Sequence, residues 1–177
     1  MSDVLPRVTL ETALGSFTVL LRADRAPLTT ANFLAYVDSG RYDDSSFFRI
    51  VNPHNQQPDD LVRISVIHGG TRPLAPDNLP MLALESTLQT GLSHGHGTLS
   101  MGRDEPDSAE GDFFICIGEQ SHFDHGGARH PDGLGFAAFG EVADGMAVVE
   151  AIFAAAGAEE YLAPSAEVRI LRAYRSA

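Results

Sequence analysis

The segment Gly111-Asp112-Phe113-Phe114-Ile115-Cys116-Ile117 has the length and composition of a buried β-strand. Because side chains alternate between the two faces of a strand, it predicts one face of Phe113, Ile115 and Ile117 and another of Asp112, Phe114 and Cys116. The first face is expected to point into the core. The second places a carboxylate beside a large aromatic ring. A buried charge is costly unless it is paired, so Asp112 requires a cation.

A second apolar segment, Ser46-Phe47-Phe48-Arg49-Ile50-Val51, contains the best candidate for that cation. Arg49 interrupts an otherwise apolar strand, and simple alternation places it on the same face as Phe47 and Val51. We therefore expect two strands to hold Arg49 next to Asp112 and an apolar pocket.

Composition bounds the class of protein. The chain has 177 residues, 44% of them hydrophobic and 20% charged, which fits one globular domain over residues 1–177. Its net charge of −12 argues against nucleic acid or an anionic membrane surface as a partner. Met1–Arg7 lacks a signal-peptide pattern, and the single cysteine, Cys116, fits a reducing compartment. We expect a cytoplasmic protein that is a monomer.

Hydrophobic periodicity predicts about eight strands and two helices. The strands are expected at residues 8–12, 15–21, 46–51, 61–68, 98–101, 111–117, 136–142 and 167–174, and the helices at 25–37 and 144–153. The segments 52–60, 71–97 and 118–135 are rich in turn-forming residues and are expected to be loops. Since helices and strands do not alternate, the pattern favours an antiparallel barrel or sandwich.

Seven short motifs in this order resemble the cyclophilin family of peptidyl-prolyl cis-trans isomerases. They are Ala26-Pro27 with Asn32-Phe33, Gly40-Arg41-Tyr42-Asp43, Phe47-Phe48-Arg49, His68-Gly69-Gly70, Gly97-Thr98-Leu99-Ser100-Met101, Asp112-Phe113-Phe114-Ile115, and Phe139-Gly140-Glu141-Val142 with Gly145-Met146. The resemblance implies a closed eight-stranded antiparallel barrel that is capped by two α-helices.

The resemblance also implies roles for individual residues. Arg49 matches the family's catalytic arginine, while His68 and Asp112 occupy positions where the family usually has two glutamines that hold the arginine. The positions that match or adjoin the family's substrate site are Phe47, Val66, Met101, Gly102, Phe114, His122, Phe123 and Phe136. In this set Phe114 matches the aromatic wall of the proline pocket, and the residue before proline is expected beside Gly102. No metal or cofactor is implied.

Isomerisation of an X-Pro bond requires only binding and polarisation. The uncatalysed reaction crosses a barrier of roughly 18–20 kcal/mol, which arises from amide resonance. An arginine can favour the twisted bond by donating a hydrogen bond to the prolyl nitrogen, which becomes basic when resonance is lost. The resemblance therefore predicts an isomerase that acts on proline-containing polypeptides and assists their folding.

Two functions remain open at this stage. One is the isomerase, and the other is a cyclophilin-like module that binds proline peptides with little or no turnover. Retention of Arg49 favours the enzyme, whereas the replacement of both glutamines favours the module. Because His122 occupies a position where many members have a tryptophan, the resemblance further implies weak or no cyclosporin binding.

Overall fold

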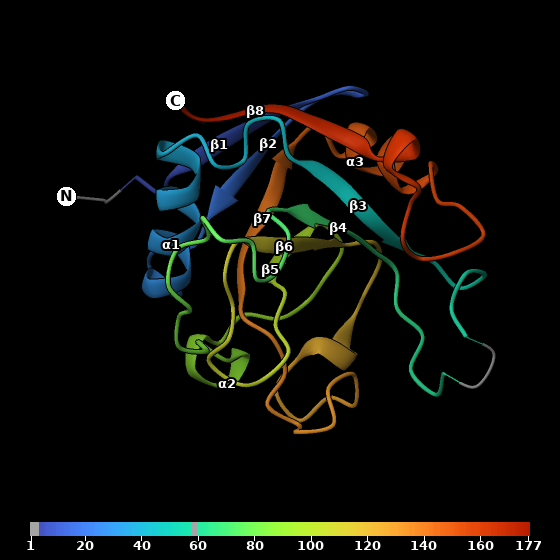
Figure 1. Cartoon of the computed structure of the whole chain (residues 1–177). Helices are drawn as coiled ribbons and strands as arrows, with labels where there is room; N and C mark the ends of the chain where they lie inside the picture. The colour runs from blue at the N-terminus through green and yellow to red at the C-terminus, as the bar shows by residue number, and fades with distance from the viewer. Residues whose placement is uncertain (1–3, 58–59) are drawn as a thin grey trace.

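A computed structural model describes residues 4–57 and 60–177, and its eight strands form a closed antiparallel barrel (Figure 1). The strands are β1 (Arg7–Thr12), β2 (Gly15–Leu21), β3 (Ser46–Val51), β4 (Val66–Gly70), β5 (Thr98–Met101), β6 (Asp112–Cys116), β7 (Ala138–Asp144) and β8 (Val168–Ser176). Their order around the barrel is β1-β2-β7-β5-β6-β4-β3-β8. The predicted barrel is confirmed.

Two longer helices, α1 (Pro27–Asp38) and α3 (Met146–Phe153), lie on different sides of the barrel (Figure 1). Both predicted helices are confirmed. They add apolar side chains such as Phe33 and Val149 to the main core. A third helix, α2 (Thr87–Thr90), is a single turn inside the segment 71–97 that was expected to be irregular.

Strand β6 shows the predicted alternation. Phe113 and Ile115 lie in the barrel core, and Phe114 and Cys116 belong to a second apolar cluster on the outer face of the sheet. Phe113 is fully buried and contacts the rings of three other aromatic residues. The strand therefore separates a structural face from a face that is available for a pocket.

Strand β3 corrects the expected alternation. The pairing of β3 with β4 shifts between Phe47 and Arg49, which marks an irregularity at Phe48. Because such a bulge adds one residue to the strand, the face on which later side chains lie is reversed. Phe47 therefore packs in the barrel core, while Arg49 lies on the outer face with Val51. The prediction that Phe47 and Arg49 share a face was wrong.

The strand predicted at 61–68 begins later, at Val66, and continues through Gly70. The reason lies in Gln56, whose side-chain amide accepts a hydrogen bond from the backbone N–H of Ile64 and donates one to its carbonyl. These bonds occupy the backbone groups that a strand would pair. The strand predicted at 136–142 likewise begins two residues later, as β7.

Two earlier expectations fall partly outside the described residues. They are the loop 52–60, of which residues 58 and 59 are not described, and the reading of Met1–Arg7, of which residues 1–3 are not described. None of the described helices is both long enough and apolar enough to span a bilayer.

Candidate active site

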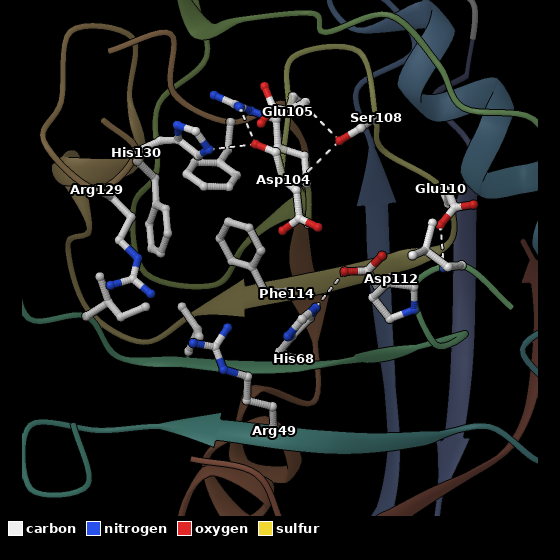
Figure 2. Close-up of a pocket in the computed structure, with 18 of the residues that line it drawn as sticks. Arg49, His68, Asp104, Glu105, Ser108, Glu110, Asp112, Phe114, Arg129 and His130 are labelled. Atoms are coloured by element: carbon white, nitrogen blue, oxygen red, sulfur yellow. Dashed lines mark hydrogen bonds and ion pairs between the residues drawn. The ribbon is translucent and has the colours of Figure 1, made fainter. Parts of the chain in front are cut away.

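A pocket of about 480 Å³ opens on the outer face of the sheet beside β3, β4 and β6 (Figure 2). Its apolar floor contains the rings of Phe114, Phe123 and Phe136. The centroid of Phe114 lies 4.6 Å from that of Phe123 and 5.7 Å from that of Phe136. Val66 and Ile64 add aliphatic surface. Such a floor suits a small apolar ring.

The three rings come from separate segments. Phe114 stands on the outer face of β6, Phe123 ends a 3-10 turn at Ser121–Phe123, and Phe136 lies just before β7. A backbone hydrogen bond from the N–H of Phe136 to the carbonyl of Phe123 (2.9 Å) joins the two loop segments. The edge-on contact between these two rings, at 86°, is a favourable aromatic geometry.

Arg49 lines the same pocket as Phe114, with 19% of its side chain exposed. Its Nε and Nη2 atoms both donate to one oxygen of Glu160, at 3.0 and 2.6 Å. Nη1 has no hydrogen-bond partner among residues 4–57 and 60–177. The guanidinium is thus held from one side, and Nη1 remains available to a ligand.

The carboxylate partner of Arg49 is therefore Glu160 and not Asp112, which corrects the expected pairing. Asp112 is 6% exposed and lies 2.8 Å from Nε2 of His68. The cause is strand order, because β4 lies between β3 and β6 and carries His68 between the other two residues. Arg49, His68 and Asp112 all line the same pocket, but Asp112 contacts His68 and not Arg49.

Gly102 lies directly under this pair. A β-carbon at this position would come within 2.1 Å of Asp112 Oδ2 and 3.2 Å of His68 Nε2. Only glycine leaves room for the carboxylate there. The backbone at Gly102 therefore borders the pocket without a side chain in the way of an extended peptide.

The structure brings together eight of the eleven residues proposed from the sequence, all of which line the pocket: Arg49, Val66, His68, Gly102, Asp112, Phe114, Phe123 and Phe136. Three lie elsewhere and correct the expectation. Phe47 and Met101 point into the barrel core, where they are 0% and 1% exposed. His122 is exposed and does not line the pocket. For Phe47 the cause is the bulge in β3, and for Met101 it is alternation along β5, which places Ser100 on the other face.

Sequence reasoning missed Glu160, which contacts Arg49, and Tyr161, which lines the pocket. Backbone pairing with β3 holds both residues. The N–H of Ile50 donates to the carbonyl of Glu160, and Tyr161 forms a bridge with Arg49. The carbon at the centre of the Arg49 guanidinium lies 5.3 Å from the centre of the Tyr161 ring. The local sequence of this loop has no strand alternation, so nothing in it indicated this pairing.

It also missed two arginines on the loops. The side chain of Arg103 is 2% exposed, makes a two-point contact with Asp132 at 2.9 and 3.0 Å, and lies over the ring of Phe136. Hydrogen bonding from Arg103 lowers the pKa of Asp132 to about 2. Arg129 also lines the pocket, where burial and then the neighbouring charge of Arg49 lower the pKa of its guanidinium.

The Arg49 guanidinium can polarise a group that is bound in the pocket, whereas Cys116 is not available there as a nucleophile. Burial raises the pKa of the Cys116 thiol, which is fully buried behind the pocket and is thus kept unreactive. In the described part of the chain no group of three or more histidine, cysteine or acidic side chains is placed to hold a metal ion. The pocket can therefore bind an apolar ring and present a guanidinium N–H next to it.

The sequence profile of the family described as "Cyclophilin type peptidyl-prolyl cis-trans isomerase/CLD" matches residues 7–175. The chain belongs to the cyclophilin family. Among its relatives, this cyclophilin is 33% identical over 146 residues to a peptidyl-prolyl cis-trans isomerase of Streptomyces antibioticus, which covers 82% of this chain and 81% of the relative. It is 32% identical over the same length to peptidyl-prolyl cis-trans isomerase B of Escherichia coli, with 82% of both chains covered.

Solved structures support the same fold for this cyclophilin. A crystal structure of a cyclophilin type peptidyl-prolyl cis-trans isomerase from Cryptosporidium parvum superposes with a TM-score of 0.72, covers 98% of each chain and is 17% identical. A second crystal structure of that protein, in the presence of the dipeptide Ala-Pro, superposes with a TM-score of 0.71 and covers 97% of this chain and 99% of that one.

Proposed function

We propose that this cyclophilin catalyses the cis–trans isomerisation of X-Pro bonds in polypeptides, with Arg49 as the catalytic donor. The observation that carries the proposal is the position of Arg49 in one pocket with the ring of Phe114, with Nη1 left open by the contact to Glu160. Family membership and the names of the relatives support it.

In this mechanism the proline ring lies on the apolar floor, and the residue before proline runs in extended form beside Gly102. As the bond twists, the prolyl nitrogen loses amide resonance and gains a basic lone pair. Nη1 of Arg49 then donates a hydrogen bond that is stronger in the twisted state than in either planar state. Such differential binding lowers the barrier without covalent chemistry.

The test is exchange NMR on a short Ala-Pro peptide. Wild type is expected to raise the cis–trans exchange rate, and Arg49→Ala is expected to remove most of the gain. Arg49→Lys keeps the charge but loses the planar fork, so a small residual gain is expected. Arg172→Ala is the matched control, because Arg172 pairs with Glu11 and does not line the pocket. An Arg49→Ala rate equal to the wild-type rate would refute the proposal.

The His68–Asp112 pair favours a second candidate, a proline-binding module with little or no turnover. A charged acid and a histidine replace a neutral amide network next to Arg49, and the acid offsets part of the positive charge in the pocket. In the same NMR experiment the module predicts line broadening from binding with no gain in exchange. That result, found for wild type, would favour the module over the enzyme.

We extend the proposal to the setting of the reaction. The substrates are proline-containing chains during folding, and the protein acts as a monomer in the cytoplasm. The single cysteine fits such a reducing compartment. Weak cyclosporin binding is expected, because His122 offers no indole donor and does not line the pocket. Calorimetry giving a submicromolar Kd would contradict this part.

A further inference from the structure

The pocket continues beyond the space that a proline ring needs. Its lining also includes Asp104, Glu105 and Glu110, which come from the loop between β5 and β6 (Figure 2). Leu74 and Met81 line the pocket as well. A single peptide bound on the floor would place its other residues against these side chains.

Charges in the pocket are divided by position. Among the residues that the structure describes, Arg49 pairs with Glu160, Arg103 with Asp132, and Asp112 with His68. The carboxylates of Asp104, Glu105 and Glu110 have no basic partner in residues 4–57 and 60–177. Figure 2 shows Glu110 and Arg129 on opposite sides of Phe114, so the Glu110 end of the pocket is acidic and the Arg129 end is basic. Asp104 lies between them, and its backbone carbonyl accepts a hydrogen bond from Arg103 Nη1 and lies 2.6 Å from His130 Nε2.

Glu110 is the most buried of these three carboxylates. The residue is 91% buried, since only 9% of its surface is exposed, and it lines the pocket. Its Oε2 accepts the backbone N–H of Leu74 at 2.8 Å, and no donor among the described residues contacts Oε1. Oε1 is not among the fully enclosed side-chain atoms, so it is open to the pocket and can pair with a cationic group of a ligand there.

The same contact fixes an apolar surface beside the acid. Leu74 has a φ of 60°, which is unfavourable for a residue with a β-carbon, and the hydrogen bond that its N–H donates to Glu110 holds it there. Leu74 is 75% exposed, and Met81 is 51% exposed. Aliphatic surface next to carboxylates suits a long basic side chain, which packs its stem and extends its charge.

The expected position of the residue before proline indicates which part of the substrate reaches this site. The proposed function places the residue before proline beside Gly102, and the chain continues from Gly102 into the loop that carries Asp104 and, farther along, Glu110. We propose that this cyclophilin selects proline segments that carry a lysine or arginine shortly before the proline, held by Glu110 and Asp104. The proposal rests on the proposed function for the position of the proline but not on turnover.

The test compares peptides that differ only in lysine, norleucine or glutamate at successive positions before Ala-Pro. Wild type is expected to bind the best lysine peptide with a Kd about five- to tenfold lower than that of the norleucine peptide, as for a partly buried ion pair. Its gain in exchange rate should be larger by a similar factor. Glu110→Gln with Asp104→Asn is expected to bring that ratio close to one. Glu110→Gln retains an oxygen for the N–H of Leu74, so the loop should keep its conformation.

The matched control is Glu141→Gln, which removes the same charge from an exposed position on β7 that does not line the pocket. It should leave the preference intact, which separates a local site from general attraction to a chain of net charge −12. Equal binding of lysine and norleucine peptides by wild type, or equal loss in Glu141→Gln, would overturn the proposal.

Zero-length carbodiimide coupling adds a direct readout. All twelve basic residues of the chain are arginines, so lysine of the peptide is the only side-chain amine in the mixture. Mass spectrometry is expected to map the peptide to Glu110 or Asp104, and mapping only to carboxylates outside the pocket would contradict the proposal. Lysine preference without isomerisation would refute the enzyme and support this site, and isomerisation without preference would do the reverse.

Discussion

At the scale of single residues, the function of Arg49 depends on how its guanidinium is held. Glu160 binds two of its nitrogens from a position 111 residues away in the chain. That partner was not predictable, because charge and periodicity in a loop do not reveal which strand edge the loop will cover. The arginine itself was predictable, because it breaks an apolar strand.

We predict that Glu160→Gln lowers kcat/KM for an Ala-Pro peptide while leaving the fold intact. A neutral amide replaces a charge-assisted acceptor, a loss of about 1 kcal/mol, or roughly fivefold in rate. Exchange NMR measures the effect, with Glu159→Gln as the neighbouring control. An unchanged rate in Glu160→Gln would show that the contact does not orient Arg49.

At the scale of elements, β6 divides stability from binding between adjacent residues. The sequence predicted this division, since alternation holds where no bulge intervenes. The same rule failed in β3, where one extra residue placed Phe47 and Arg49 on opposite faces of the strand. Bulges leave no clear signal in a run of apolar residues, so such an error is inherent in reading strands by alternation.

Substitutions at the two neighbouring phenylalanines of β6 are expected to separate these roles. Phe113→Leu should lower the free energy of unfolding by about 1–3 kcal/mol and leave the kcat/KM of the folded protein nearly unchanged. Phe114→Leu should reduce kcat/KM more than stability, because its ring forms the pocket floor. Urea unfolding and exchange NMR on both variants measure this, and the opposite assignment of effects would contradict it.

A second prediction at this scale concerns the loops that Arg103 and Asp132 join. The pKa of Asp132 is about 2 in the folded protein and 3.8 ordinarily, so the pair stabilises the fold above about pH 4 and loses its effect as pH falls toward 2. Asp132→Asn should therefore unfold at lower urea than wild type at pH 6. That difference should shrink between pH 4 and pH 2, and a gap that is constant with pH would argue against it.

At the scale of the whole molecule, the barrel was predictable and the boundary of the pocket was not. Eight alternating segments and two helices suffice to indicate the architecture. The pocket is completed by loops, including Arg129 and Glu110, whose spatial neighbours depend on the order of strands around the barrel. No local pattern encodes that order, which also explains why His68 and not Arg49 contacts Asp112.

The reactivity of the Cys116 thiol should report on global unfolding. The thiol is fully buried, and burial raises its pKa, so both access and ionisation are suppressed in the folded state. We predict that Ellman's reagent labels it only through opening of the barrel, at a rate that rises with urea in proportion to the unfolded population. Fast labelling in the absence of urea would contradict this placement.

The edge at which β3 meets β8 closes the barrel and also holds the segment that contacts Arg49. Strand β3 pairs with β8 only at Ser46 and Phe47, and beyond them its edge is covered by residues 160–162. Breathing of that short cover would release the clamp on Arg49 while the other seven strand contacts persist. Transient inactivation should therefore precede global denaturation, and amide hydrogens at Ile50 and Leu162 should exchange with deuterium sooner than those between β4 and β6.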